Sequence, residues 1–131
     1  MGLLSKLFGS KAESVADEPE REEHAVLLHL RYEANEDGFP IEEGVVEQYQ
    51  DVEDRLEAAI AHAKVGELDG DEFGDGVCVV YTYGPDADLL WDAMRPVLEG
   101  QTWPAGSHAV KRYGNPGKDV RSERIDLAGS G

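Results

Sequence analysis

The segment that most constrains the fold of this chain is the stretch from Gly66 to Gly84, which reads GELDGDEFGDGVCVVYTYG. Its second half, VCVVYTYG, is rich in β-branched and aromatic residues, which favour a strand. Its first half alternates acidic residues with glycines, and glycine supplies the positive φ angles that tight turns require. The two halves together predict a β-hairpin. We expect the acidic arm to be an edge strand, because its charges oppose pairing with a further strand.

A helix is predicted before the hairpin. Apolar residues recur there at the spacing of an amphipathic helix, and they are Val45, Tyr49, Val52, Leu56, Ala59, Ile60 and Ala63. The start of this helix is open between Val45 and Asp51, because Asp51 followed by Asp54 also fits an N-cap. Gly66 is predicted to end the helix.

A second helix is predicted directly after the hairpin. The sequence GPDAD is typical of a helix start, since proline fixes φ and aspartates suit the positive end of the helix macrodipole. The apolar stripe that follows consists of Ala87, Leu90, Trp91, Met94, Val97 and Leu98. Pro96 is expected to kink or shorten this helix, and Gly100 is expected to end it.

Strands are predicted on both sides of these helices. From His24, the segment HAVLLHLRYE alternates as a strand, with Val26, Leu28, Leu30 and Tyr32 on one face and Leu27, His29 and Arg31 on the other. HAVKRYG predicts a fourth strand, and VRSERIDL predicts a fifth that pairs back on it. The order β-α-β-β-α-β, with an additional C-terminal edge strand, is that of the ferredoxin-like α+β fold. In that fold both helices pack on one face of an antiparallel sheet.

Such a fold leaves the opposite sheet face open to a ligand, a second subunit or another chain. The expected interaction face comprises Leu27, His29, Arg31, Lys111 and Tyr113. Residues 24–127 are predicted to form a single domain, preceded by a flexible tail (1–23) and followed by a short tail (128–131). The tail begins with a short amphipathic segment, residues 1–11, and continues as an acidic linker. We favour a frayed segment over a membrane-contacting one, because isolated helices of about three turns are marginal in water.

The charge of the chain restricts its partners. Twenty-eight acidic residues against twelve Lys and Arg give a net charge of −16, and nucleic-acid phosphates need a basic footprint. We therefore predict no nucleic-acid partner, whereas a basic protein is compatible with the charge. Cys78 is the one cysteine, so no intrachain disulfide can form and a reducing, cytoplasmic location is predicted. No apolar run approaches the length of a membrane span.

The acidic arm invites a calcium interpretation that its details do not support. Its acidic residues are Glu67, Asp69, Asp71, Glu72 and Asp75. An EF-hand loop that began at Asp69 would place Phe73 and Val80 where oxygen ligands are required. The glycines of this arm precede a strand and lack the lysine of a phosphate-binding loop. Turn formation is the better interpretation of the glycines.

Other residues that could carry chemistry also lack a full set of partners. Tyr81 and Tyr83 share a strand face, as base-stacking aromatics do, but no basic residue accompanies them. His29 and His108 lie on strands that this fold makes neighbours, so they are a candidate metal pair without a third ligand. Cys78, among valines, is interpreted as a small buried residue. We therefore predict no catalytic, cofactor-binding or metal-binding residues.

Basic residues gather around the predicted C-terminal hairpin, at Lys111, Arg112, Lys118, Arg121 and Arg124. Their contrast with the acidic arm could support self-association. A solvated edge hairpin is an equally good interpretation, because peripheral charges steer encounters more than they stabilise complexes.

Several segments resemble a set of small bacterial proteins. These segments are DGDEFGDG, VYTYGPDAD, PVL and KRYGNPG. In the set, a helix like VEDRLEAAI precedes a DG-x-E-x-G-x-G hairpin and a YGPDAD helix start. The resemblance covers roughly residues 24–127 and implies the same fold, with Asp71 as a departure that makes the arm more acidic. It implies no activity, since the shared motifs concern turns and helix starts.

Three functional hypotheses follow. The leading one is a non-catalytic binding or regulatory module that forms a homodimer through sheet faces or edges. The first alternative is an inhibitor or immunity-type protein for a basic partner. The second is a metal-dependent enzyme or sensor that uses His29, His108 and carboxylates on the open sheet face.

Overall fold

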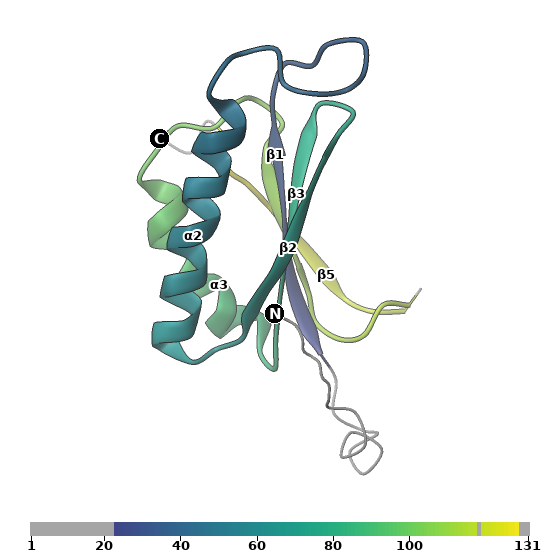
Figure 1. Cartoon of the computed structure of the whole chain (residues 1–131). Helices are drawn as coiled ribbons and strands as arrows, with labels where there is room; N and C mark the ends of the chain where they lie inside the picture. Colours follow the sequence, from purple (N-terminus) through teal and green to yellow (C-terminus); the bar gives the residue numbers. More distant parts are fainter. Residues whose placement is uncertain (1–22, 118, 129–131) are drawn as a thin grey trace, which may run out of the picture.

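The computed structural model describes residues 23–117 and 119–128. Seven elements follow one another in this part of the chain (Figure 1). They are β1 (His24–Arg31), α2 (Val45–Ala63), β2 (Glu67–Gly74), β3 (Val77–Gly84), α3 (Ala87–Glu99), β4 (His108–Arg112) and β5 (Ser122–Asp126). The predictions made for residues 1–22 and 129–131, and for Lys118, lie outside the described residues.

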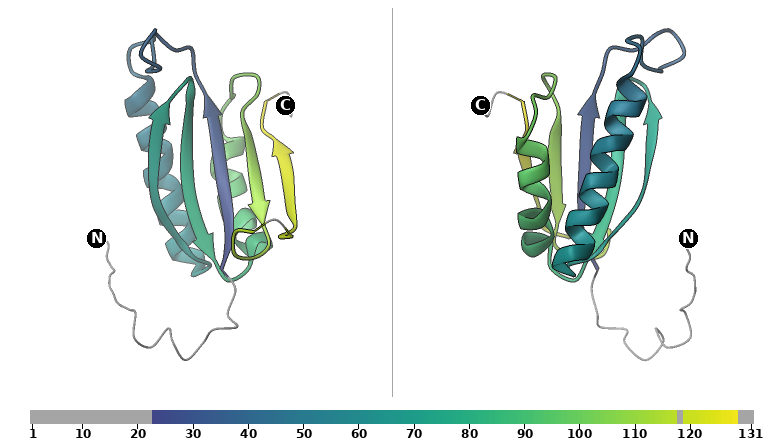
Figure 2. Two further views of the ribbon diagram at one scale, coloured as in Figure 1. Left: turned by 90° about the vertical axis from the view of Figure 1, so that its right-hand side faces the viewer. Right: turned by 60° about the vertical axis from the view of Figure 1, so that its left-hand side comes forward.

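The five strands form one sheet in the order β2-β3-β1-β4-β5, and every neighbouring pair is antiparallel. At the centre, Leu28 of β1 pairs with Val80 of β3 on one side and with Ala109 of β4 on the other. Figure 2 shows both helices on the same face of this sheet. The predicted α+β, ferredoxin-like fold with an additional C-terminal edge strand is confirmed.

The hairpin predicted from Gly66 to Gly84 is also confirmed, with β2 as an edge strand of the sheet. Gly74 pairs with Val77, which leaves Asp75 and Gly76 as a two-residue loop. Their φ angles are 54° and 82°. Positive φ at both central residues is the geometry of a type I′ turn, whose twist matches that of the flanking strands.

The structure decides the start of α2, which the sequence left open, and corrects its end. The helix begins at Val45, after Gly44 with φ 90° and without a side-chain cap, so Asp51 lies inside it. It ends at Ala63, and the left-handed C-cap residue is Lys64 and not Gly66. Gly66 serves another purpose, because a Cβ there would overlap the carbonyl oxygen of Tyr83 in the facing strand.

The start of α3 is confirmed, since the Asp86 side chain accepts hydrogen bonds from the amides of Asp88 and Leu89. Gly100 is the C-cap residue, as predicted. Pro96 lies inside the helix, which continues to Glu99, so the proline does not end it.

The core lies between the sheet and the two helices. The helix-facing residues of β1 and β3 are fully buried, and they are Val26, Leu28, Leu30, Cys78, Val80 and Thr82. From α2, Val52, Leu56 and Ile60 close the core, and from α3, Leu90 and Met94 do so. The Thr82 hydroxyl donates to the carbonyl oxygen of Val26 at 2.7 Å, so the polar group in this layer is satisfied.

Candidate functional site

We call the sheet face turned away from the helices the open face. It carries the residues of the three central strands that alternate with the buried ones, namely Leu27, His29, Arg31, Val77, Val79, Tyr81, Tyr83, His108, Val110 and Arg112. Except for the exposed Arg31, all of these are half-buried, and Ala25, which pairs with Tyr83 and Arg112 on the same face, is fully buried. Because neither helix lies on this side (Figure 2), the partial burial comes from neighbouring side chains of the same face.

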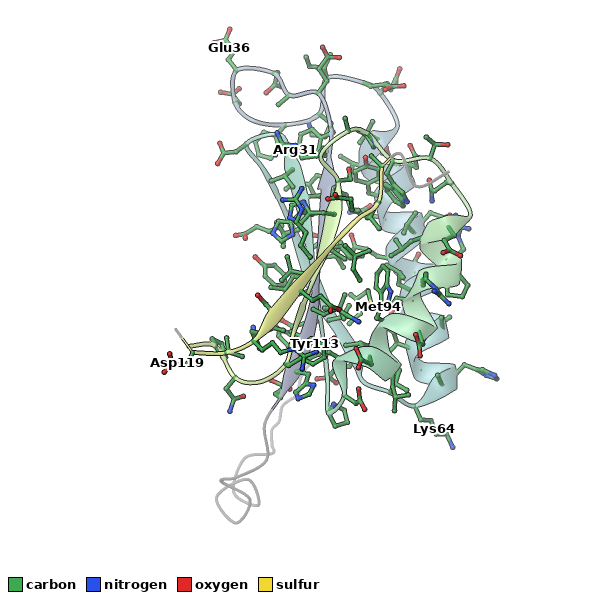
Figure 3. The ribbon with its side chains drawn as sticks, turned by 180° about the vertical axis from the view of Figure 1, so that it is seen from behind. Arg31, Glu36, Lys64, Met94, Tyr113 and Asp119 are labelled. Atoms are coloured by element: carbon green, nitrogen blue, oxygen red, sulfur yellow. The ribbon has the colours of Figure 1, made fainter. Side chains whose placement is uncertain are left out.

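Three of the five residues predicted for an interaction face lie on the open face: Leu27, His29 and Arg31. Lys111 and Tyr113 do not, and this placement is a correction. Along β4, side chains alternate between the two faces. Lys111 therefore shares the helix-covered face with Ala109. Figure 3 shows Arg31 and Tyr113 at opposite ends of the sheet.

Lys111 belongs to a cluster of charged groups beside the start of α3. Its side chain is 11% exposed, and Nζ lies 2.8 Å from Asp88 Oδ1 and 3.2 Å from Glu123 Oε1. The Tyr113 hydroxyl also donates to Asp88, at 2.6 Å. Burial acts to lower the pKa of Lys111, but hydrogen bonds to Asp88, Tyr113 and Glu123 outweigh it and raise the pKa. The cluster ties β4 and β5 to α3, and each charge in it has an opposite charge close by.

The two histidines of the candidate metal pair are directly opposite in the register and stack, with ring centroids 4.5 Å apart and planes within 5°. His108 Nδ1 lies 2.9 Å from the Gly106 carbonyl oxygen, which fixes the proton on that nitrogen. Burial, and then His108, lowers the pKa of His29, so the neutral ring is favoured. Lone pairs of parallel stacked rings lie in parallel planes and do not converge on one ion. This geometry favours a stacked pair over a metal pair.

The open face is also graded in charge. Glu67 and Glu72 lie on the β2 side, where Glu72 accepts a hydrogen bond from the Tyr81 hydroxyl at 3.0 Å. Arg112 and Arg124 lie on the β4–β5 side, together with Asp126, whose Oδ1 lies 2.9 Å from Arg124 Nε. The face thus has an acidic margin, an apolar and aromatic centre, and a margin with two arginines.

Because side chains alternate along β2, the acidic residues that suggested a calcium site lie on two different faces of the sheet. Asp71 pairs with the buried Val80 and so lies on the helix side, whereas Glu72 pairs with Val79 and lies on the open face. Asp75 is in the turn. Carboxylates that alternate between two faces cannot surround one calcium ion.

A different group of ligand-type side chains meets on the helix side. Glu53 of α2, Asp71 of β2 and Cys78 of β3 place one ligand atom each within 4.8 Å of one another. Cys78 is fully buried, as predicted. Sequence reasoning did not find this group, because its members belong to three separate elements. One signal was available: Glu53 lies directly beside the apolar stripe of α2, four residues after Tyr49 and three before Leu56.

A groove of about 630 Å³ lies between the end of α3, the loop that follows it and the end of β5. Its apolar lining comes from Trp91, Leu98, Trp103, Ile125 and Leu127. The groove exists because the helices pack mainly on the four other strands and leave the helix side of β5 uncovered. The Trp103 indole donates to the Leu98 carbonyl oxygen at 2.8 Å, which holds the loop against α3.

Comparison with protein-family models finds no match, and comparisons with curated proteins and with solved structures find none either. Among the described residues, neither helix combines the length and the apolar character needed to cross a membrane.

Proposed function

We propose that the protein is a non-catalytic binding module whose contact surface is the open face, and whose partner is a second copy of the chain. The observation that carries the proposal is the composition of β3. A strand covered on one side alternates apolar and polar residues, whereas a strand buried on both sides is apolar throughout. The outward residues of β3 are Val77, Val79, Tyr81 and Tyr83, although no element of the described chain covers them.

The charges of the open face favour one way of pairing two copies. In a face-to-face dimer the two-fold axis lies between the sheets. An axis parallel to β1 places the acidic β2 margin of one copy over the β4–β5 margin of the other, so that Glu67 and Glu72 lie toward Arg112 and Arg124. An axis perpendicular to the strands would instead bring the two acidic margins together. Charge complementarity therefore supports the axis parallel to β1.

Light scattering on the full chain at tens of micromolar tests self-association. We expect a molar mass of twice the 14.3 kDa chain. Val79→Lys should reduce it to one chain, because two ammonium groups would meet near the centre of the interface, while within each copy the lysine can pair with the neighbouring Glu72. Ile41→Lys is the matched control, since Ile41 is an exposed apolar residue outside the open face and its substitution should leave the dimer intact.

The outcomes separate the parts of the proposal. A wild-type mass of one chain would rule out self-association at this concentration. A dimer that survives Val79→Lys would place the contact on another surface. If Glu72→Arg and Arg124→Glu each weaken the dimer and the double variant does not restore it, the orientation is wrong even though the face is right.

A second candidate is an inhibitor or immunity-type protein for a basic partner, and the outer side of α2 favours it. Glu47, Asp51, Asp54 and Glu57 are all exposed there. Such a complex should weaken steeply with salt. A dimer centred on the apolar open face should be much less sensitive to salt. For either function we propose a cytoplasmic location, on the ground that the single cysteine suits a reducing compartment.

A further inference from the structure

Three side chains that can bind a metal ion converge on the helix side of the sheet, behind the acidic edge strand. Glu53 comes from α2, Asp71 from β2 and Cys78 from β3, and one ligand atom of each lies within 4.8 Å of the others. No other group of three or more His, Cys, Asp or Glu ligand atoms gathers this closely among residues 23–117 and 119–128. The cluster lies on the opposite side of the sheet from the open face and is independent of the proposed dimer.

Two of these groups carry a buried ligand atom without a hydrogen-bond partner, although Glu53 as a whole is half-buried. The Cys78 side chain is 0% exposed, and its thiol makes no hydrogen bond with any described residue. Glu53 Oε2 is one of only two buried side-chain nitrogen or oxygen atoms without a hydrogen-bond partner in the described part of the chain. A buried polar group without a partner calls for an explanation such as a bound ion. Both groups are directed into the same cluster.

The electrostatic environment of the cluster also favours a bound cation. Burial, and then the hydrogen bond and charge of Asp71, raises the pKa of Glu53 to about 9. Burial, followed by the charges of Asp71 and Glu53, also raises the pKa of Cys78. Without a cation, Glu53 and Cys78 keep their protons, because three anions this close would repel one another. A divalent cation would reverse that preference, because it stabilises the deprotonated ligands.

We propose that Glu53, Asp71 and Cys78 form a binding site for a divalent transition-metal ion of the zinc class. A thiolate with carboxylate oxygens suits zinc or cobalt, whereas calcium and magnesium select oxygen ligands alone. Metal–sulfur and metal–oxygen bonds of about 2.3 and 2.1 Å separate tetrahedral ligand atoms by about 3.5 Å. Ligand atoms now within 4.8 Å of one another therefore need only small side-chain rotations.

Binding at this site involves no redox change. One M²⁺ ion replaces the thiol proton of Cys78 and the carboxyl proton of Glu53, and both protons pass to solvent. The carboxylate of Asp71 is the third ligand. Because Asp71 is exposed, a water molecule can reach the fourth position of the ion from that side. The metal would connect the edge strand β2 to α2.

Cobalt(II) titration of the chelator-treated full chain tests the site, because a thiolate–cobalt bond gives a near-ultraviolet charge-transfer band. We expect one cobalt per chain, displacement of cobalt by zinc with loss of the band, and a higher melting temperature with zinc. Cys78→Ser should abolish the band. Glu53→Gln should retain the fold, since glutamine resembles the protonated acid. It should weaken zinc binding at least about tenfold, because even the loss of a group that only hydrogen-bonds a metal ligand has an effect of that size.

The matched control is His29→Gln with His108→Gln, which removes the stacked histidines and should leave the cobalt band unchanged. A wild-type protein without a charge-transfer band, and with unchanged melting in zinc, overturns the proposal. A band that survives Cys78→Ser, or that disappears in the histidine variant, overturns it as well, because the metal would then lie elsewhere. If Cys78→Ser does not fold, unchanged zinc affinity of Glu53→Gln still refutes the site.

Discussion

Replacement of Gly84 by alanine tests the close backbone approach at the base of the hairpin. A Cβ at Gly84 would overlap the Val65 carbonyl oxygen and would lie 3.3 Å from Gly66 Cα. Both neighbours are backbone atoms, so no side chain can rotate away to make room. Gly84 has an ordinary φ angle, so the expected cost is steric and does not include strain from a left-handed backbone.

The size of the effect follows from this overlap. Overpacking that shifts the backbone costs typically about 1–3 kcal/mol, and an overlap with two backbone segments belongs at the upper end. We expect Gly84→Ala to lower the free energy of unfolding by about 3 kcal/mol, which corresponds to a fall of roughly 10–20 °C in Tm for a domain of about 100 residues. Urea unfolding followed by tryptophan fluorescence measures it, because Trp91 and Trp103 are 7% and 5% exposed.

Gly74→Ala provides the matched control in the same hairpin. A Cβ at Gly74 meets no heavy atom within 4 Å. In the unfolded chain alanine has less conformational freedom than glycine, so it loses less entropy when the strand forms. We therefore expect Gly74→Ala to raise the free energy of unfolding by less than about 1 kcal/mol. Equal unfolding free energies for Gly84→Ala and Gly74→Ala would refute the close approach of the two backbone segments.

Two further predictions concern titratable groups. Lys111→Met should change the free energy of unfolding by less than about 1.5 kcal/mol at pH 7, because methionine keeps most of the buried volume. It should also flatten the acid limb of the stability curve, which is the fall in the free energy of unfolding below about pH 4 measured by urea unfolding at each pH. The hydrogen bond from Lys111 lowers the pKa of Asp88. Ionised Asp88 therefore stabilises the folded state at pH values above the usual Asp pKa, and this stabilisation is lost as the pH falls through the lowered pKa. An unchanged acid limb would contradict the pairing. For His29, burial and the neighbouring His108 lower the pKa, so the stability of the wild type should fall as the pH drops below about 6.5. His29→Gln should lose less stability between pH 7 and pH 5, and parallel curves would show that His29 is not the responsible group.

Most of the fold could be predicted from the sequence because its signals are local. The period of two in HAVLLHLRYE, the period of 3.6 in the helices and the glycines of the hairpin each depend on nearby residues. The order of these elements then allowed few topologies. The choice between Val45 and Asp51 as the start of α2 could not be made in this way, because Gly44 offers no side-chain cap. Tertiary contacts decide it instead: the Tyr49 hydroxyl donates to the Arg31 carbonyl oxygen at 2.7 Å, and its ring packs against Trp103.

The sites depended more on tertiary structure than the fold did. The alternation of side chains along HAVLLHLRYE was enough to place Leu27, His29 and Arg31 on the open face. Alternation along β4 also puts Lys111 on the helix-covered face, but only the tertiary structure shows that Asp88 and Glu123 stabilise a nearly buried ammonium group there.

The sequence by itself thus determined the elements, their order and the faces that a regular period assigns. Only the tertiary structure decided which side chains from different elements meet. His29 and His108 stack because the register of β1 and β4 makes them opposite. Glu53, Asp71 and Cys78 converge because α2 lies over the β2–β3 hairpin. The physical reason is that periodicity is a property of neighbours along the chain, whereas the meeting of distant side chains depends on how the separate elements pack.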